Sequence, residues 1–161
     1  MNHTDNKSVT SFYEHASEEE RQIIEQVVKG LADKREGRFT SNVSALFNLE
    51  ADNGEELLTL HMPVTPMLYN SLGIVHGGVT ATAIDTAMGT LANRTVPEGF
   101  GAVTSQLTIH YTAPVSGTEV TAHARIIHRG SKTMVLEGWL TGSDQKRMAH
   151  ATASFFLIPK K

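Results

Sequence analysis

The chain contains no cysteine among its 161 residues. This absence excludes a disulfide scaffold, a catalytic thiolate and any zinc site built on cysteine. No run approaches about 18 consecutive apolar residues, the length of a membrane-spanning helix, so no membrane span is expected. The amino-terminus also lacks the apolar segment of a signal peptide. We therefore expect a cytoplasmic protein.

An excess of positive charge is also missing. The formal net charge is −3, with 14 Lys and Arg against 17 Asp and Glu. A protein without a basic surface is not expected to bind nucleic acid or an anionic membrane. Hydrophobic residues make up 40% of the chain and charged residues 19%, which is the balance of a globular protein with one sizeable core.

The amino-terminal part is predicted to carry one amphipathic helix. Residues 1–16 are polar and expected to be loose or only locally ordered. Ser17 and Glu20 then have the spacing of a capping box, which covers the first free amides of a helix. The apolar positions that follow recur at helical spacing: Ile23, Ile24, Val27, Val28 and Leu31. We assign residues 1–38 to an extension and residues 39–161 to the main domain.

The main domain begins with two strand-like segments, residues 43–49 and 57–62, around the hairpin signal Asn53-Gly54. An irregular stretch and an apolar helix over residues 77–93 follow. The remaining extended runs cover residues 102–112, 120–128, 134–141 and 147–158. Short turns between successive runs favour an antiparallel sheet, and the whole predicts an α+β domain.

The helix over residues 77–93 is apolar nearly all round and rich in small side chains, so we expect it to be buried with the sheet curled around it. One carboxylate, Asp85, lies in its middle. Because an unpaired buried carboxylate is costly, Asp85 must be exposed, paired with a cation such as Arg94 or Arg125, or functional.

Sequence motifs surround this helix: Asn70-x-x-Gly73-x-x-His76-Gly77-Gly78, Asp85-Thr86-Ala87, Val103-Thr104-x-x-Leu107-x-Ile109-x-Tyr111 and Pro114-x-x-Gly117. In these motifs and spacings, residues 42–157 resemble the acyl-CoA thioesterases of the phenylacetate-degradation, or PaaI-like, type. The resemblance implies the hotdog fold, an antiparallel sheet wrapped around a long central helix. It also implies an acyl-CoA substrate, no separate cofactor, and a homodimer or homotetramer whose active site is shared between subunits.

Thioester hydrolysis needs an activated water or nucleophile and a group that stabilises the oxyanion. Amides at a helix amino-terminus have no intrahelical partner, and glycine lets an acyl group approach closely. Gly77 and Gly78 are therefore candidates for polarising the carbonyl. The resemblance assigns that role mainly to the Gly77 amide, with His76 beside it. The alternative is that both glycines only form a tight turn.

The resemblance implies that Asp85 is the nucleophile or general base. It gives Asn70 of the neighbouring subunit the task of positioning the water or the thioester. Thr104 matches a position near Asp85, where its hydroxyl could hold the water. The alternatives are a turn residue for Asn70 and an ordinary strand residue for Thr104.

Arg129 and Lys132 lie in a predicted turn that the resemblance places near the phosphates of coenzyme A; a plain basic hairpin turn is the alternative. We interpret His76 as a structural residue whose ring holds the loop. The other histidines lack metal-ligand spacing, so no metal site is expected.

The leading functional prediction is an acyl-CoA thioesterase that releases a free acid and coenzyme A. Three alternatives are weighed against it. A hotdog hydratase would need a different Asp and His pattern, and an aromatic acyl-CoA thioesterase of the hydroxybenzoyl or dihydroxynaphthoyl type often carries Glu on the central helix. A non-catalytic acyl-CoA-binding hotdog protein is the third.

Overall fold

The computed structural model describes residues 9–52, 54 and 56–160. The chain divides into two compact units, of which the first ends at Leu46 and the second begins at Phe47. The domain division after residue 38 stays a prediction. Asn53 of the expected hairpin signal and residues 1–8 lie outside the described residues.

The first unit contains the predicted amphipathic helix, α2 (Glu18–Arg35), which a short helix, α1 (Val9–His15), precedes. The capping box of α2 is confirmed. The Glu20 amide donates to the Ser17 hydroxyl across 3.2 Å, and the Ser17 amide donates to the Glu20 carboxylate across 2.7 Å. These bonds satisfy amides that the first turn of a helix leaves free.

A third helix, α3 (Asn42–Phe47), replaces the strand that was expected over residues 43–49. That prediction is wrong because local capping outweighs strand propensity at this point. The Ser41 hydroxyl accepts from the Ser44 amide across 3.0 Å, and the Ser41 carbonyl accepts from the Ala45 amide across 3.1 Å. Helix α2 contacts this segment closely, since a Cβ on Gly30 would lie 2.3 Å from the Ala45 carbonyl oxygen.

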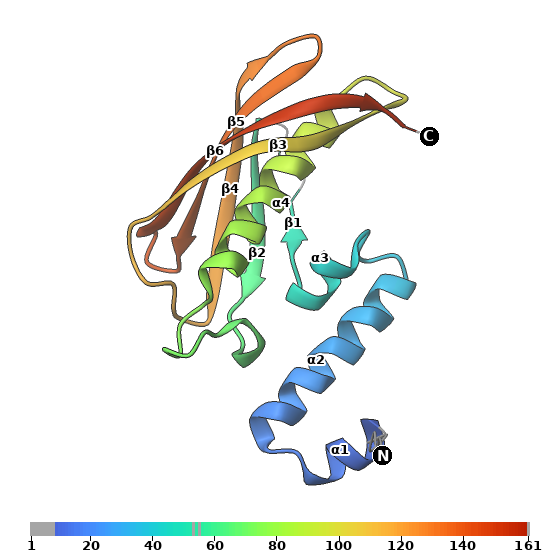
Figure 1. The fold of residues 1–161 in the computed structure, drawn as a ribbon, viewed down its shortest axis with the longest axis vertical. Coiled ribbons are helices and arrows are strands. Elements are labelled where there is room, and N and C mark those ends of the chain that lie inside the picture. Colours follow the sequence, from blue (N-terminus) through green and yellow to red (C-terminus); the bar gives the residue numbers. More distant parts are fainter. Residues whose placement is uncertain (1–8, 53, 55, 161) are drawn as a thin grey trace, which may run out of the picture. The chain divides into compact units, whose positions relative to one another are not determined.

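The second unit contains one six-stranded antiparallel sheet in the order β1-β2-β4-β5-β6-β3 (Figure 1). Its strands are β1 (Glu50–Ala51), β2 (Leu57–Pro63), β3 (Phe100–Tyr111), β4 (Glu119–Arg129), β5 (Thr133–Gly142) and β6 (Arg147–Pro159). A 3-10 turn, η1 (Pro66–Leu68), lies in the segment expected to be irregular. The predicted strands after residue 56 are thus confirmed, and β3 lies at one edge of the sheet.

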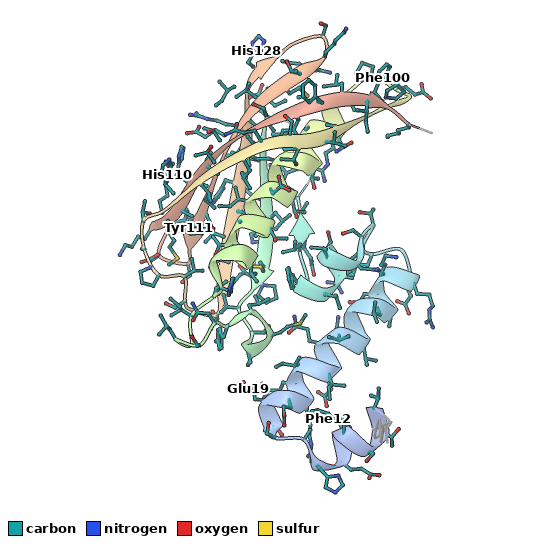
Figure 2. All side chains as sticks on the ribbon, in the orientation of Figure 1. Phe12, Glu19, Phe100, His110, Tyr111 and His128 are labelled. Carbon is teal, nitrogen blue, oxygen red and sulfur yellow. The ribbon has the colours of Figure 1, made fainter. Side chains whose placement is uncertain are left out.

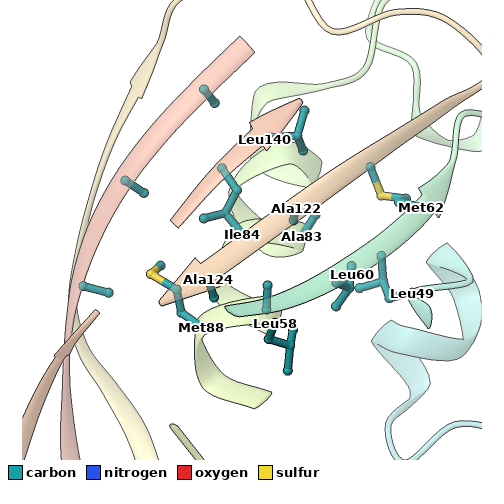
Figure 3. Packing of buried hydrophobic residues seen from close by; sticks show 14 of the residues in the cluster. Leu49, Leu58, Leu60, Met62, Ala83, Ile84, Met88, Ala122, Ala124 and Leu140 are labelled. Carbon is teal, nitrogen blue, oxygen red and sulfur yellow. The ribbon is translucent and has the colours of Figure 1, made fainter. Parts of the chain in front are cut away.

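The apolar helix, α4 (Gly77–Thr95), packs against one face of this sheet, which curves around it (Figure 1). Ile84 and Met88 of α4 belong to the same buried apolar cluster as Leu58 and Leu140 of the strands (Figure 3). The helix lies so close to β5 that a Cβ on Gly138 would be 2.6 Å from a methyl carbon of Ile84. The α+β fold with a sheet wrapped around a central helix is therefore confirmed. Within the described part of the chain, no helix has the length and apolarity needed to cross a membrane.

Candidate functional site

The first turn of α4 is capped by the ring of His76. His76 has an extended backbone, and its Nδ1 accepts a hydrogen bond from the Gly78 amide across 2.9 Å. Since the amide can only donate, Nδ1 is unprotonated and the ring proton sits on Nε2. The ring thus holds the turn, in agreement with the structural interpretation of His76.

The amide of Gly77 is left without a partner in this turn. The Gly78 amide is bound to the His76 ring, and the amides of Val79 and Thr80 both donate to the His76 carbonyl. The Gly77 amide donates no hydrogen bond to any described residue. A free N–H at the positive end of a 19-residue helix is a ready donor to an anionic oxygen.

A pocket of about 410 Å³ opens beside this turn. Its lining residues are Asn70, Ile74, Val75, Gly77, Thr80, Tyr111, Thr112, Ala113, Pro114 and Val115. The pocket therefore brings two of the predicted site residues, Asn70 and Gly77, to one cavity whose walls carry no charged side chain.

Asn70 holds its own loop and also faces this pocket. Its side-chain oxygen accepts from the Leu72 amide across 2.8 Å, and its backbone carbonyl accepts from the Gly73 amide across 3.0 Å. The left-handed backbone of Gly73, with φ 71°, completes the turn. The side-chain nitrogen of Asn70 donates to no described residue. Its turn role is thus realised, and its amide group keeps a donor for a ligand.

Asp85 lies half-buried on α4 and accepts a hydrogen bond from the Thr104 hydroxyl across 2.9 Å. Neither proposed cation partner reaches it. Arg94 donates to the Asp52 carbonyl across 2.6 Å, and Arg125 pairs with Glu137. The structure therefore brings Asp85 and Thr104 together and leaves Asp85 without an ion pair among the described residues.

Within one chain, the Gly77 amide and the Asp85 carboxylate are far apart. Eight residues separate them, which is about 12 Å along the helix axis. An oxyanion donor must lie about 3 Å from the carbonyl oxygen, and an attacking atom about 3–3.5 Å from the carbonyl carbon. Two groups this far apart along one helix do not both contact a single thioester group directly.

Arg129 and Lys132 lie on either side of the tight β4–β5 turn, where both are exposed. Figure 2 shows His128, the neighbour of Arg129, at the opposite end of the sheet from Tyr111. The structure therefore does not bring these cations to the Gly77 turn of the same chain. No cluster of three or more His, Asp or Glu that could hold a metal occurs among the residues that the structure describes.

Sequence reasoning gave no role to Tyr111, which ends β3. Its hydroxyl donates to the Gly77 carbonyl oxygen across 2.9 Å, although 34 residues separate the two. The only sequence signal was its place at the end of one of the motifs.

Comparisons with known proteins bear on this arrangement. A sequence model of the Thioesterase superfamily matches residues 72–149, which include α4 and most of the sheet. The acyl-coenzyme A thioesterase PaaI of Escherichia coli is 31% identical over 102 residues, which cover 63% of this chain and 69% of that protein. The chain belongs to the thioesterase superfamily. The predicted PaaI-like family, its hotdog fold and the class of thioester hydrolase are thereby confirmed.

Two further proteins are similar to this chain. A Saccharolobus solfataricus protein, named as a candidate esterase, is 32% identical over 89 residues, which span 55% of this chain and 63% of that protein. The BH2602 protein of Bacillus halodurans, whose crystal structure was solved with CoA, has a TM-score of 0.86 and 39% identity. That match covers 92% of this chain and 97% of the other, so it includes much of the amino-terminal part.

Proposed function

We propose that this thioesterase hydrolyses acyl-CoA to a free carboxylic acid and coenzyme A. The observation that carries the proposal is the pair of groups on α4: a free amide at Gly77 and a carboxylate at Asp85 that the Thr104 hydroxyl orients. The names of the similar E. coli and B. halodurans proteins, one an acyl-CoA thioesterase and one solved with CoA, support the substrate class.

The reaction follows from these groups. A water molecule attacks the thioester carbon while Asp85 accepts its proton. The charge that develops on the carbonyl oxygen is stabilised by the Gly77 amide. Collapse of the intermediate breaks the carbon–sulfur bond and expels the coenzyme A thiolate, which takes up the proton. Direct attack by Asp85 would instead form an anhydride that water then hydrolyses. The side-chain nitrogen of Asn70 positions the water or the thioester.

The site is proposed to form between two copies of the chain. Along α4, Tyr111 of β3 lies beside Gly77 and Thr104 lies beside Asp85. When β3 pairs antiparallel with a second β3 about a two-fold axis, one residue lies opposite its own copy. An axis at Thr108 brings the Thr104 end of one strand beside the Tyr111 end of the partner's strand. The Asp85 end of α4 in each chain then lies near the Gly77 end of α4 in the other. The carboxylate of one chain and the amide of the other can therefore act on the same thioester.

The exposure of β3 supports this pairing. It is an edge strand of 12 residues, and Phe100, Val103 and Tyr111 on it are exposed. A long apolar edge is a template for pairing with another chain unless it is covered. A homodimer is therefore the proposed unit, and a homotetramer would join two such dimers. We further propose that Arg129 and Lys132 bind the coenzyme A phosphates, that no separate cofactor is needed, and that the protein is cytoplasmic.

The test uses two inactive variants, Gly77→Pro and Asp85→Asn. Proline at position 77 removes the free N–H of that residue. Proline is tolerated there because residue 77 is the first position of the helix. His76, with φ −60° and ψ 136°, already has the backbone that a following proline requires. Gly77→Ala keeps the amide and serves as the matched control, because its Cβ would meet Tyr111 at an ordinary 3.5 Å.

Each inactive variant should lose roughly 10²–10³-fold in kcat for acyl-CoA hydrolysis, measured as thiol release, while Gly77→Ala stays active. Equal amounts of the two variants, mixed after dissociation, should recover about a quarter of the wild-type activity, because half of the dimers carry one intact site. No recovery would place the whole site in one chain. Tight CoA binding without turnover of short, long or aromatic acyl-CoA would instead identify a binding protein.

A further inference from the structure

The contact between Tyr111 and Gly77 joins the edge strand to the turn that carries the free amide. The phenol hydroxyl donates to the Gly77 carbonyl across 2.9 Å, and its ring atoms lie 3.5–3.6 Å from the position of a Cβ on Gly77. Figure 2 shows Tyr111 at the end of β3 that lies nearest the start of α4. The ring thus covers the residue proposed to polarise the thioester.

The peptide unit between Gly77 and Gly78 is held at both ends. Its carbonyl oxygen accepts from Tyr111, and its N–H donates to Nδ1 of His76. Two successive glycines have the widest choice of backbone conformations, and no Cβ restrains the plane of this peptide. Both glycines belong to the first turn of α4, whose intrahelical hydrogen bonds also act on this peptide, and the two aromatic side chains add one further restraint at each end.

The preceding peptide unit, between His76 and Gly77, carries the free amide. Its carbonyl oxygen accepts from the amides of Val79 and Thr80 across 2.9 and 3.1 Å. When both neighbouring peptide planes are fixed, the backbone angles of Gly77 between them are fixed as well. The Gly77 N–H then points in one direction before substrate binds, as an efficient oxyanion donor requires.

These two hydrogen bonds also follow one another in the same donor-to-acceptor direction. The Tyr111 hydroxyl donates to the peptide carbonyl, and the N–H of the same peptide donates to the His76 ring. Successive bonds of this kind polarise one another. Tyr111 therefore favours the His76 tautomer that carries its proton on Nε2.

We propose that Tyr111 is a positioning residue, which acts through the Gly77–Gly78 peptide to hold the Gly77 amide and the His76 tautomer in place. The catalytic part of this proposal rests on the proposed function. Tyr111 is half-exposed, so removal of its hydroxyl leaves no buried polar group and the chain should still fold.

The experiment compares Tyr111→Phe with Tyr69→Phe. Phenylalanine keeps the ring over Gly77 and removes only the hydroxyl. Tyr69 is also an exposed tyrosine of the same unit, and its hydroxyl bonds to no described residue, so it is the matched control. Tyr111→Phe should lower kcat roughly 10-fold with KM changed less than about twofold, because the amide acts on charge that develops in the transition state. Tyr69→Phe should match the wild type.

A second measurement does not depend on activity. Nitrogen NMR distinguishes the protonated from the bare ring nitrogen of His76, and it should show a single Nε2–H tautomer in the wild type and in Tyr69→Phe. In Tyr111→Phe the two tautomers should mix, and the Gly78 amide should exchange faster with solvent. Sedimentation checks that all variants keep one oligomeric state, because Tyr111 lies on the proposed pairing strand.

The outcomes separate the two proposals. Wild-type kcat together with unchanged His76 signals in Tyr111→Phe would overturn the positioning role. A rise in KM with unchanged kcat would also overturn it and would make Tyr111 a substrate-binding residue. If the wild type hydrolyses no acyl-CoA, the proposed function fails, yet the NMR comparison still decides whether Tyr111 orders the turn.

Discussion

The hydroxyl of Thr104 on β3 donates a hydrogen bond to the carboxylate of Asp85 on α4 across 2.9 Å. The strand is irregular at this point, where the register shifts between Thr104 and Gln106. Ser105, the extra residue, turns instead to the neighbouring strand and donates to the Ser154 carbonyl across 3.0 Å. A bulge of this kind re-aims side chains next to functional sites, and here it accompanies a hydroxyl that points at the carboxylate.

Replacing Thr104 by valine should separate its two interpretations. Valine keeps the β-branched shape that suits a strand and removes the hydroxyl. Because a hydrogen bond to a charged group is one of the stronger kinds, kcat should fall roughly 10-fold in steady-state hydrolysis assays. Thr104→Ser, which keeps the hydroxyl, should stay within about threefold of the wild type. Equal activity of the valine variant and the wild type would leave Thr104 an ordinary strand residue.

The double substitution Arg129→Ala with Lys132→Ala tests the coenzyme A contact. Loss of two charge-assisted phosphate contacts should raise KM for acyl-CoA by roughly 10-fold, with little change in kcat, and should weaken the salt dependence of KM. The matched control is a change of substrate. An acyl-pantetheine thioester lacks the nucleotide phosphates, so the same variant should hydrolyse it as the wild type does. An equal loss on both substrates would argue for a plain structural turn.

Two glycine substitutions test the packing of α4 on the sheet. A Cβ on Gly138 would lie 2.6 Å from Ile84 and 3.1 Å from Met88, both fully buried. Gly138→Ala should therefore lower the free energy of unfolding by about 1–3 kcal/mol in urea titrations. Gly89→Ala is the opposite case. Its Cβ would make only an ordinary 3.6 Å contact with Phe155, so the helix should gain about 0.5–1 kcal/mol.

Glu137 on the outer face of β5 gives a pH prediction. The pKa of the Glu137 carboxyl lies below its usual value, mainly because His150 forms a hydrogen bond with it. A hydrogen bond from Arg125 also lowers this pKa. The unfolded chain therefore binds more protons than the folded one in acid. The stability due to this carboxylate is complete above about pH 4.3 and is lost as the pH falls through the folded pKa.

Glu137→Gln should accordingly be less stable than the wild type near neutral pH and should lose less stability on acidification. Thermal unfolding at a series of pH values measures both effects. Glu98→Gln removes an exposed carboxylate from the turn after α4 and should follow the wild-type curve. If Glu137→Gln and the wild type lose stability in parallel below pH 5, the carboxylate has no such role.

Local signals account for much of what could be predicted. The capping box at Ser17 and the apolar run from Gly77 are readable within a few residues of the chain, and both helices begin where they were expected. The strand predicted over residues 43–49 was wrong because a serine cap, Ser41, two residues before that segment, starts a helix. Short apolar segments are ambiguous in this way, since one hydrogen-bonded cap outweighs weak propensities.

The sequence by itself determined the candidate groups: a glycine turn at the start of an apolar helix, a lone carboxylate at Asp85 and a β-rich second half. Only the tertiary structure decided how these groups are satisfied. Strand register and a bulge bring Thr104 to Asp85, and the curvature of the sheet brings Tyr111 to Gly77. Such contacts span 19 and 34 residues, and no local pattern encodes them, because they depend on how the whole sheet packs around α4.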